Sequence, residues 1–283
     1  MISTFEPLWG SLNSHGWAIA IVTDKSDQRG PAPHSAVPVL QVSGLAKTYV
    51  GAPLPALDGL SLEVHRGEIL GLLGPNGAGK TTAISIMNTL LRPTAGQVMI
   101  CGIDAVRYPN RVRALFGSVP QEIALFERLS AAENLSYFGR MHGLKGARLK
   151  AAVEKGLHVA GLTARAAEQV GTFSGGMKRR ANLVAGILHQ PPLLFLDEPT
   201  VGIDAQSRNL ILESLMVLRD QGTAMVYTTH YMEEARQLCS RVAIIDHGRR
   251  LALGSPRTLI DQSPGCEDLG DLYLRLTGRQ LRD

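Results

Sequence analysis

The amino-acid sequence predicts an α/β fold in which a mostly parallel core sheet is joined to an antiparallel β subdomain and an inserted α-helical subdomain. An apolar strand at 68–73 leads through a glycine-rich loop into an apolar-periodic helix at 81–91. Residues 39–65 contain strands with the apolar–polar alternation of antiparallel sheets, and strands alternate with helices again after residue 175. Between these regions, residues 122–172 show helical periodicity without a convincing strand.

The glycine-rich loop has the form G-x-x-x-x-G-K-[ST], which is typical of a P-loop NTPase. Such a loop wraps its backbone N–H groups around phosphate oxygens at a helix N-terminus, and its glycines allow the close approach. Lys80 then places a positive charge near the β- and γ-phosphates of a bound nucleoside triphosphate, and the Thr81 hydroxyl can join the ligands of Mg²⁺. As a loop side chain, Lys80 is expected to be exposed and to contribute little packing. The residues expected to bind the nucleotide here are Gly74, Pro75, Asn76, Gly77, Ala78, Gly79, Lys80, Thr81 and Thr82.

Length and composition restrict the class of protein. With 283 residues, 45% of them apolar, the chain can bury a substantial core in one large or two small domains. The net charge of +4 is mild and the densest basic run is 178–180, so no nucleic-acid arm is expected. The three cysteines are far apart and lack metal-ligand spacing, which fits a reducing cytoplasm. No apolar run reaches the roughly 18 residues needed to span a bilayer.

The chain divides into an extension, a main domain and a tail. Residues 1–37 read as a disordered or loosely docked extension, and the apolar run 17–22 is too short for a signal peptide. The main domain is expected over 38–260, with the helical subdomain at about 122–172, and a short helical tail over 261–283.

Turn residues and apolar periodicity locate the individual elements. Pro93–Gly96 is turn chemistry after the first helix, and Ser130 with Glu133 forms a capping box that starts a helix running to about Met141. The other segments are read from the same two signals. The expected strands are 39–42, 60–65, 68–73, 97–101, 115–119, 193–196, 223–228, 242–246 and 249–253, and the expected helices are 81–91, 130–141, 175–189, 205–219, 231–239 and 256–262.

Two adjacent acids end the apolar strand at 193–196. The carboxyl end of a buried parallel strand, beside the phosphate loop, is where a nucleotide enzyme needs negative charge. Asp197 is placed to hold Mg²⁺, mostly through water, and Glu198 to polarise the water that attacks the γ-phosphate. The plainer interpretation is a capping carboxylate after a core strand, but two uncompensated acids there are costly without a cation.

A second anion-binding candidate is the stretch Ser174-Gly175-Gly176, about twenty residues before that strand. A serine hydroxyl and free backbone N–H groups at a helix start attract an anion, and the helix dipole reinforces them. Alone, this pattern is usually only a helix cap. Between a phosphate loop and an Asp-Glu strand it is highly specific.

With these motifs in place, the sequence from about Val39 to the C-terminus resembles the ATP-binding subunit of ABC transporters. The motifs occur in the family order, and they are a Walker A loop at 74–81, a Q-loop at Gln121, a signature at 173–178, a Walker B strand ending at Asp197 and Glu198, a D-loop around Asp204 and an H-loop at His230.

The resemblance implies a dimer in which two ATP molecules lie between two such domains. Each γ-phosphate would touch Lys80 of one subunit and the stretch 174–176 of the other. Gln121 would sense Mg²⁺ and the attacking water while coupling to the transport partner, and His230 would contact the γ-phosphate and orient the water with the glutamate. Tyr49 fits the aromatic residue that stacks on adenine, although a strand-face tyrosine is the plainer alternative.

Within the family, the stretches 174–180, 229–235 and 276–283 resemble ABC-2-type exporter ATPases, such as drug-resistance and polyketide-antibiotic efflux subunits. Phe173 stands where the family usually has leucine, and 201–203 is more apolar than in many members. Neither departure removes a site residue.

The resemblance therefore implies a cytoplasmic ATPase that a membrane-spanning permease subunit holds on the inner face of the cell membrane. It would work as a homodimer or heterodimer and would not bind nucleic acid. Residues near Gln121 and over 122–145 should contact the permease. The alternative is an ABC-type ATPase acting on the ribosome or DNA, but such proteins usually carry two cassettes, long coiled coils or zinc modules. A P-loop kinase or GTPase would not need residues 174–176. Import rather than export stays open on the motifs alone.

Overall fold

The computed structural model describes residues 37–278, so nearly all of the predicted extension 1–37 and the last residues of the predicted tail lie outside the described residues. The described chain contains two sheets. The larger sheet consists of β3 (Ile69–Leu73), β6 (Phe116–Val119), β7 (Leu193–Asp197), β8 (Ala224–Thr229), β9 (Arg241–Asp246) and β10 (Arg249–Gly254). The smaller sheet consists of β1 (Leu40–Lys47), β2 (Leu57–Val64), β4 (Ala95–Ile100) and β5 (Ile103–Asp104).

The larger sheet has the order β10-β9-β3-β8-β7-β6. Its inner pairs are parallel, and only the β9–β10 hairpin at one edge is antiparallel. The smaller sheet has the order β2-β1-β4-β5 with antiparallel pairs throughout. The predicted fold class, a P-loop α/β fold with a mostly parallel core and an antiparallel β subdomain, is therefore confirmed.

The buried parallel strands separate two cores. All five residues of β3 and of β7 are buried, and successive side chains of a strand point to opposite faces. Leu70 and Leu72 accordingly face a core shared with the smaller sheet and helix α1 (Lys80–Met87). Ile69 and Leu73 face a core on the other side. That second core is covered by α6 (Ala205–Asp220), α7 (Met232–Leu238) and α9 (Leu269–Thr277).

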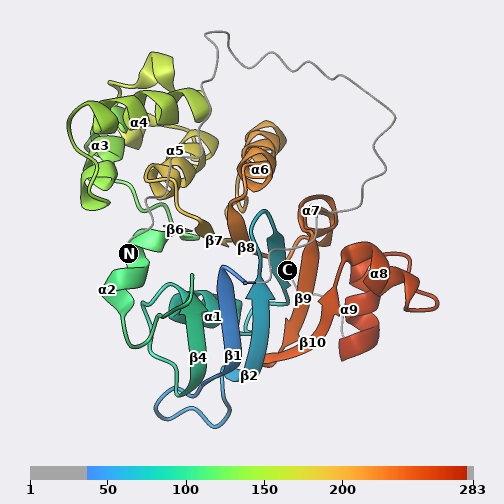
Figure 1. The fold of residues 1–283 in the computed structure, drawn as a ribbon. Coiled ribbons are helices and arrows are strands. Elements are labelled where there is room, and N and C mark those ends of the chain that lie inside the picture. The colour runs from blue at the N-terminus through green and yellow to red at the C-terminus, as the bar shows by residue number, and fades with distance from the viewer. Residues whose placement is uncertain (1–36, 279–283) are drawn as a thin grey trace.

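A third core lies within the helical region, which Figure 1 shows as a separate lobe above the sheets. It contains residues of α3 (Ala131–Met141), α4 (Gly146–Val159) and α5 (Gly175–Ile187), together with the chain that leads into α5. The capping box at the start of α3 is present as predicted, because Glu133 Oε2 accepts from the Ser130 N–H at 2.8 Å and Ser130 Oγ accepts from the Glu133 N–H at 3.2 Å. This box fixes where α3 begins.

The first helix is shorter than the sequence predicts. The expectation was 81–91, but α1 ends at Met87. Thr89 adopts φ 64°, in the left-handed region, and the N–H groups of Leu90 and Leu91 both fold back onto the Ser85 carbonyl. This reversal ends the helix before the predicted turn at 93–96.

Some short elements were not predicted, namely β5 and α2 (Pro109–Val112), because each is too short to show a period. The chain after β10 forms α8 (Pro256–Asp261) and then α9, whose Leu269, Leu272 and Tyr273 are buried in the second core. Within residues 37–278 no helix is both long and apolar enough to cross a bilayer.

Candidate functional site

The loop between β3 and α1 has a backbone that only glycine can form. Gly79 has φ +105°, and a Cβ there would lie 2.5 Å from the Ala56 carbonyl oxygen. A Cβ on Gly74 would lie 2.4 Å from the Ile245 carbonyl oxygen. Gly77 has φ +84° with open space around it. The loop is thus packed tightly against the chain on one side and open on the other, which is the shape a phosphate-binding loop needs.

Lys80, the first residue of α1, is buried rather than exposed. Its side chain is 5% exposed, and Nζ donates to the Gly74 carbonyl at 2.8 Å and to the Pro75 carbonyl at 3.3 Å. Nζ also lies 3.3 Å from Glu198 Oε1. The expectation of an exposed loop lysine that contributes little packing is therefore wrong. Two carbonyls of the loop accept hydrogen bonds from Lys80 Nζ, and the Glu198 carboxylate forms an ion pair with it.

The two adjacent acids at the end of β7 point to different partners. Asp197 Oδ1 accepts from the Thr228 hydroxyl at 2.6 Å, and both acids are buried. Glu198 has φ +45°, a left-handed conformation that is rare outside glycine, and its N–H donates to Thr228 Oγ1 at 2.9 Å. This turn of the backbone separates the two carboxylates, so that each can have its own task.

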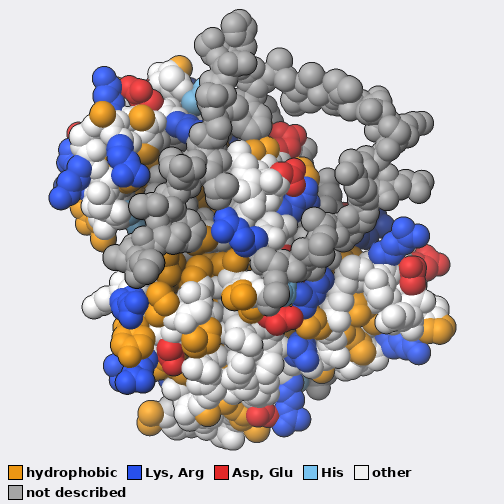
Figure 2. Space-filling model, viewed as in Figure 1, with side chains coloured by type: hydrophobic (Ala, Val, Ile, Leu, Met, Phe, Trp, Pro, Cys, Tyr) orange, Lys and Arg blue, Asp and Glu red, His pale blue; other side chains and the backbone are white. Residues whose placement is uncertain are grey.

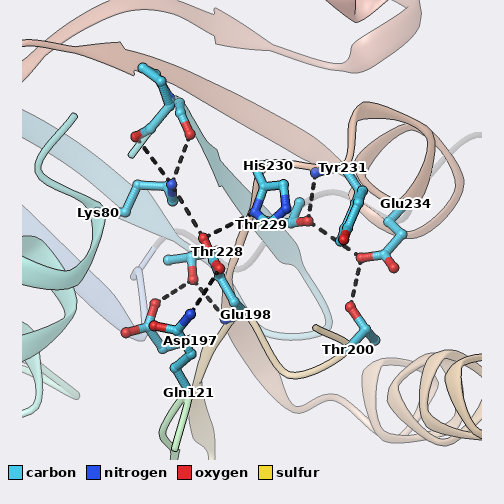
Figure 3. Close-up of polar contacts among 12 residues, drawn as sticks. Lys80, Gln121, Asp197, Glu198, Thr200, Thr228, Thr229, His230, Tyr231 and Glu234 are labelled. Carbon is cyan, nitrogen blue, oxygen red and sulfur yellow. Dashed lines mark hydrogen bonds and ion pairs between the residues drawn. The ribbon is translucent and has the colours of Figure 1, made fainter. Parts of the chain in front are cut away.

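The Glu198 carboxylate is where the predicted catalytic residues meet (Figure 3). Oε1 lies 3.3 Å from Lys80 Nζ and 3.3 Å from His230 Nδ1, and Oε2 accepts from Gln121 Nε2 at 3.3 Å. Gln121 follows β6, Glu198 follows β7 and His230 follows β8, three neighbouring parallel strands. Their carboxyl ends lie at one edge of the sheet, which is where ligands bind in α/β folds.

A cavity of about 300 Å³ opens beside this carboxylate. Its lining combines the phosphate loop with Gln121 and Glu198, and the sequence did not point to its remaining member, Ala56. The lining residues are Ala56, Pro75, Asn76, Gly77, Gly79, Lys80, Thr81, Thr82, Gln121 and Glu198. A polar cavity with one cation and one carboxylate suits a phosphate chain and a metal ion together.

The donor set suits Mg²⁺ better than a transition metal. Residues 37–278 contain no cluster of three or more His, Cys, Asp or Glu side chains that could hold a metal. Mg²⁺ needs few protein ligands, because it keeps waters and takes oxygens from substrate phosphates. Thr81 in the first turn of α1 and Asp197 at the end of β7 are oxygen donors of the required kind. Gln121 is bonded through its amide nitrogen to Glu198, which leaves its oxygen as the candidate metal ligand.

Tyr49 lies beside the phosphate loop and is partly exposed. The residue is 44% exposed, its hydroxyl lies 3.3 Å from Thr82 Oγ1, and Lys47 Nζ lies over the ring, 5.5 Å from its centroid. Tyr49 is therefore an exposed aromatic residue next to the phosphate loop.

Ser174, Gly175 and Gly176 begin helix α5 but do not line the cavity. Ser174 caps the helix, with Oγ accepting from the Met177 N–H at 3.3 Å. A Cβ on Gly176 would lie 2.0 Å from Ser207 Oγ, so glycine there lets α5 pack closely on α6. The structure therefore places this second anion-binding stretch away from the phosphate loop of the same chain.

Asp204 caps α6, accepting from the Ser207 N–H at 2.8 Å. That backbone hydrogen bond, with the Ser207 hydroxyl second, lowers the pKa of Asp204. Asp204 lies next to the start of α5, because a Cβ on Gly176 would lie 3.0 Å from its Oδ2. The D-loop and signature residues thus form a group of their own.

Sequence reasoning missed some residues of the site. Thr228 joins both acids, and its only signal was a polar residue near the end of a buried strand. Arg179 donates to the Gln121 carbonyl through Nη1 and to the Val201 carbonyl at 3.3 Å through Nη2, so it links the loops after β6 and β7. In the sequence Arg179 was only part of the basic run 178–180.

Comparison with known proteins gives a consistent result. Residues 57–201 match the family model described as ABC transporter. The chain is 43% identical over 240 residues to the linearmycin resistance ATP-binding protein LnrL of Bacillus subtilis, covering 84% of this chain and 75% of that protein. It is 42% identical over 243 residues to the doxorubicin resistance ATP-binding protein DrrA of Mycobacterium tuberculosis, covering 86% and 71%.

A solved structure described as an ATP binding subunit of an ABC transporter superposes with a TM-score of 0.77. It is 30% identical in sequence, and the match covers 84% of this chain and 99% of that one. The likeness thus extends over most of the chain.

Proposed function

Because this chain belongs to the ABC transporter family of ATP-binding proteins, we propose that it powers outward transport of a substrate through a separate membrane-spanning partner. Like the resistance ATPases it is similar to, it is an ATP-binding subunit of the ABC-2 exporter type and hydrolyses ATP. The observation that carries the mechanism is the meeting of Lys80, Gln121 and His230 on the Glu198 carboxylate.

Glu198 is the proposed general base. A base must lie within hydrogen-bond reach of the proton it accepts, and this carboxylate lines the cavity beside the phosphate loop. His230, at 3.3 Å, orients it, and Gln121 holds the other carboxylate oxygen. Lys80 turns from the loop carbonyls to the β- and γ-phosphates. Lys80 is thus the proposed phosphate-binding group, and Glu198 is the group that takes part in the chemistry.

Thr81, Asp197 and Gln121 are the proposed residues that hold Mg²⁺. When bound, the ion neutralises charge on the phosphate oxygens. Thr228 fixes the Asp197 side chain through its 2.6 Å hydrogen bond. Tyr49 is proposed to stack on adenine, the only part of ATP that presents a large flat face.

The ATP site is proposed to be completed by a second ATPase subunit, identical or different. Support comes from the place of Ser174, Gly175 and Gly176, which begin α5 but do not line the cavity of their own chain. Gly175 is exposed, and a Cβ there would have only the Gly202 carbonyl oxygen nearby, at 3.9 Å. An exposed helix start with free N–H groups can meet the γ-phosphate held by a partner. Asp204, beside it, belongs to the same face.

The membrane-spanning partner is proposed to dock on the helical lobe next to Gln121. Phe126, Tyr137 and Phe138 form an aromatic cluster there, with ring centroids 5.0 Å apart for the first pair and 5.4 Å for the last. Phe126 is 47% and Tyr137 43% exposed, so these adjoining rings offer an apolar surface of the kind that protein partners cover. Arg179 ties the Gln121 backbone to the loop after β7, so movement at the docking surface reaches the Walker B acids.

The names of the relatives support export, since they are described as resistance or export proteins. A cytoplasmic location, on the inner face of the membrane through the partner, follows from this proposal. The alternative, an ATPase acting on the ribosome or DNA, has less support. Nucleic-acid binding favours a continuous basic band. Figure 2 shows Lys and Arg side chains dispersed over the visible face, without such a band.

Membrane fractionation tests this proposal. The chain should pellet with membranes in cells that also produce its membrane-spanning partner, and should stay in the supernatant without that partner. The double variant Phe126→Asp/Tyr137→Asp should lose the association. Leu251→Asp, on an exposed apolar residue of β10 at the opposite edge of the sheet from β6, is the matched control and should keep it. Firm membrane retention without the partner would overturn the proposal.

A further inference from the structure

Helix α7 carries a buried carboxylate that the mechanism above does not use. Glu234 is 5% exposed. Its Oε2 accepts from the Tyr227 hydroxyl at 2.8 Å and from the Thr200 hydroxyl at 2.9 Å, and it lies 3.4 Å from the Thr229 hydroxyl. Its Oε1 lies 3.3 Å from Arg208 Nε, an ion pair whose N–H does not point directly at the oxygen. A buried charge persists in a fold only when it is paired and hydrogen-bonded in this way.

The donors to Glu234 come from separate parts of the chain. Thr200 lies in the loop after β7, Tyr227 and Thr229 lie on β8, and Arg208 lies on α6. Burial, and then the charge of Glu234, raises the pKa of Tyr227 well above its ordinary value, so the phenol stays a hydrogen-bond donor. One carboxylate therefore fastens the loop after β7, the end of strand β8 and helix α6 to α7.

The loop after β7 carries the proposed base, and the end of β8 leads directly into its histidine. Thr200 is two residues after Glu198, and Thr229 directly precedes His230. Thr229 Oγ1 also accepts from the Tyr231 N–H at 2.9 Å, so the backbone on both sides of His230 is held (Figure 3). The 3.3 Å separation of His230 Nδ1 and Glu198 Oε1 therefore depends on two short backbone segments, 198–200 and 229–230. Each segment is hydrogen-bonded to Glu234, through Thr200 and Thr229 respectively.

Arg208 extends this linkage to the D-loop. It lies four residues after Asp204, the cap of α6, and its guanidinium lies 5.4 Å from the Tyr231 ring centroid. A displacement of residues 201–204 moves the N-terminal turn of α6 and with it Arg208. The Arg208–Glu234 pair is the direct connection from that turn to the segment carrying His230.

We propose that Glu234 is a positioning residue for ATP hydrolysis, which sets the separation of His230 and Glu198 and links it to the loop 201–204. This inference rests on the proposed roles of Glu198 and His230. It adds a residue that touches neither the cavity nor the phosphate loop. Its effect passes through Thr200 and Thr229 to the reacting end of the site.

Glu234→Gln is the direct test. A glutamine oxygen can still accept from Tyr227 and Thr200, but the amide N–H group would face the Arg208 guanidinium, donor against donor, and the ion pair would be lost. The expected result is a fall in kcat for ATP on the order of 10- to 100-fold, as for a small misplacement of catalytic groups, with KM for ATP little changed. Glu233→Gln is the matched control, because Glu233 is the neighbouring acid on α7 but is exposed and pairs with the exposed Arg236.

A double-mutant cycle separates positioning from a purely structural role. If Glu234 acts through His230, adding Glu234→Gln to His230→Ala should lower kcat by less than about 2-fold, because the group being positioned is already gone. Equal losses in both backgrounds would overturn the inference. Tyr227→Phe, which removes one donor to Glu234 and keeps the ring in place, should reproduce part of the loss in kcat. Parent kcat in Tyr227→Phe would also contradict positioning, and this variant serves if Glu234→Gln fails to fold.

The outcomes distinguish this inference from the function beneath it. Parent turnover by both Glu198→Gln and His230→Ala would remove the proposed catalytic roles and the positioning role with them. Slow turnover by those two variants, together with Glu234→Gln matching Glu233→Gln, would overturn the positioning role alone.

Discussion

The buried pair of Lys80 and Glu198 predicts a stability effect that an exposed loop lysine would not have. The perturbation is a double-mutant cycle of Lys80→Met and Glu198→Gln, which remove the charges while keeping side-chain length. The two side chains are 5% and 8% exposed, and their charged atoms lie 3.3 Å apart. Each single variant leaves the other charge buried without its main partner.

The magnitude follows from the distance and the burial. At 3.3 Å, the attraction is about 5 kcal/mol for an effective dielectric constant of about 20, before desolvation is subtracted. Breaking a buried pair by removing one partner costs roughly 3–5 kcal/mol. Here the cost should be lower, about 2–3 kcal/mol, because loop carbonyls remain for Lys80 and Gln121 and His230 remain for Glu198. The double variant should lose less than the sum of the singles by about 1–3 kcal/mol.

The assay is urea unfolding of the parent and the variants without nucleotide, with the free energy of unfolding taken by linear extrapolation. Omitting ATP and Mg²⁺ keeps ligand binding out of the measured stability. Additivity of the two substitutions within about 0.5 kcal/mol would refute the reasoning, because it would mean that the two charges do not interact in the folded protein.

Other substitutions test separate parts of the account. Gly79→Ala should destabilise the fold by about 2 kcal/mol or more in thermal unfolding. It should destabilise more than Gly77→Ala, because both residues have positive φ but only the Cβ at Gly79 meets a carbonyl oxygen. Tyr49→Ala should weaken ATP binding by about 1–3 kcal/mol in a fluorescent-nucleotide titration, while Tyr49→Phe should keep it, if the ring stacks on adenine. Burial, and then the neighbouring His142, lowers the pKa of His189 to about 4. The unfolded chain therefore takes up the proton first, and stability should fall as pH drops from 6.5 towards 4, by about 3 kcal/mol in full. His189→Gln should flatten that part of the pH profile of urea unfolding. An unchanged profile would contradict the assignment of this pH dependence to His189.

The sequence predicted the features that repeat along the chain or are local to it. Burial on both faces gives a strand a continuous apolar run, which located the strand at 68–73 and the strand ending at Asp197. Glycine spacing located the loop between the first of these strands and the helix at 81–91. The early end of α1 was missed, because the left-handed Thr89 leaves no such pattern.

Which of several similar residues is buried could not be predicted. Glu233 and Glu234 are adjacent acids on one helix, yet one is exposed and the other forms the centre of a buried network. Residues 178–180 looked like one basic cluster, but Lys178 pairs with Glu127 at 2.7 Å, Arg179 reaches two loop carbonyls and Arg180 donates to Ala160. These differences depend on contacts between distant segments, which sequence spacing does not contain.

The measurement that tests the central claim most directly is the oligomeric state of Glu198→Gln by size-exclusion chromatography with ATP and Mg²⁺. A composite site predicts a variant that binds ATP, turns over on the order of 10²- to 10⁴-fold more slowly, and accumulates as an ATP-bound dimer, while Lys80→Ala stays monomeric. Normal turnover by Glu198→Gln would remove the residue from the catalytic role. An inactive Glu198→Gln that binds ATP and stays monomeric, even with the membrane-spanning partner present, would contradict the shared site.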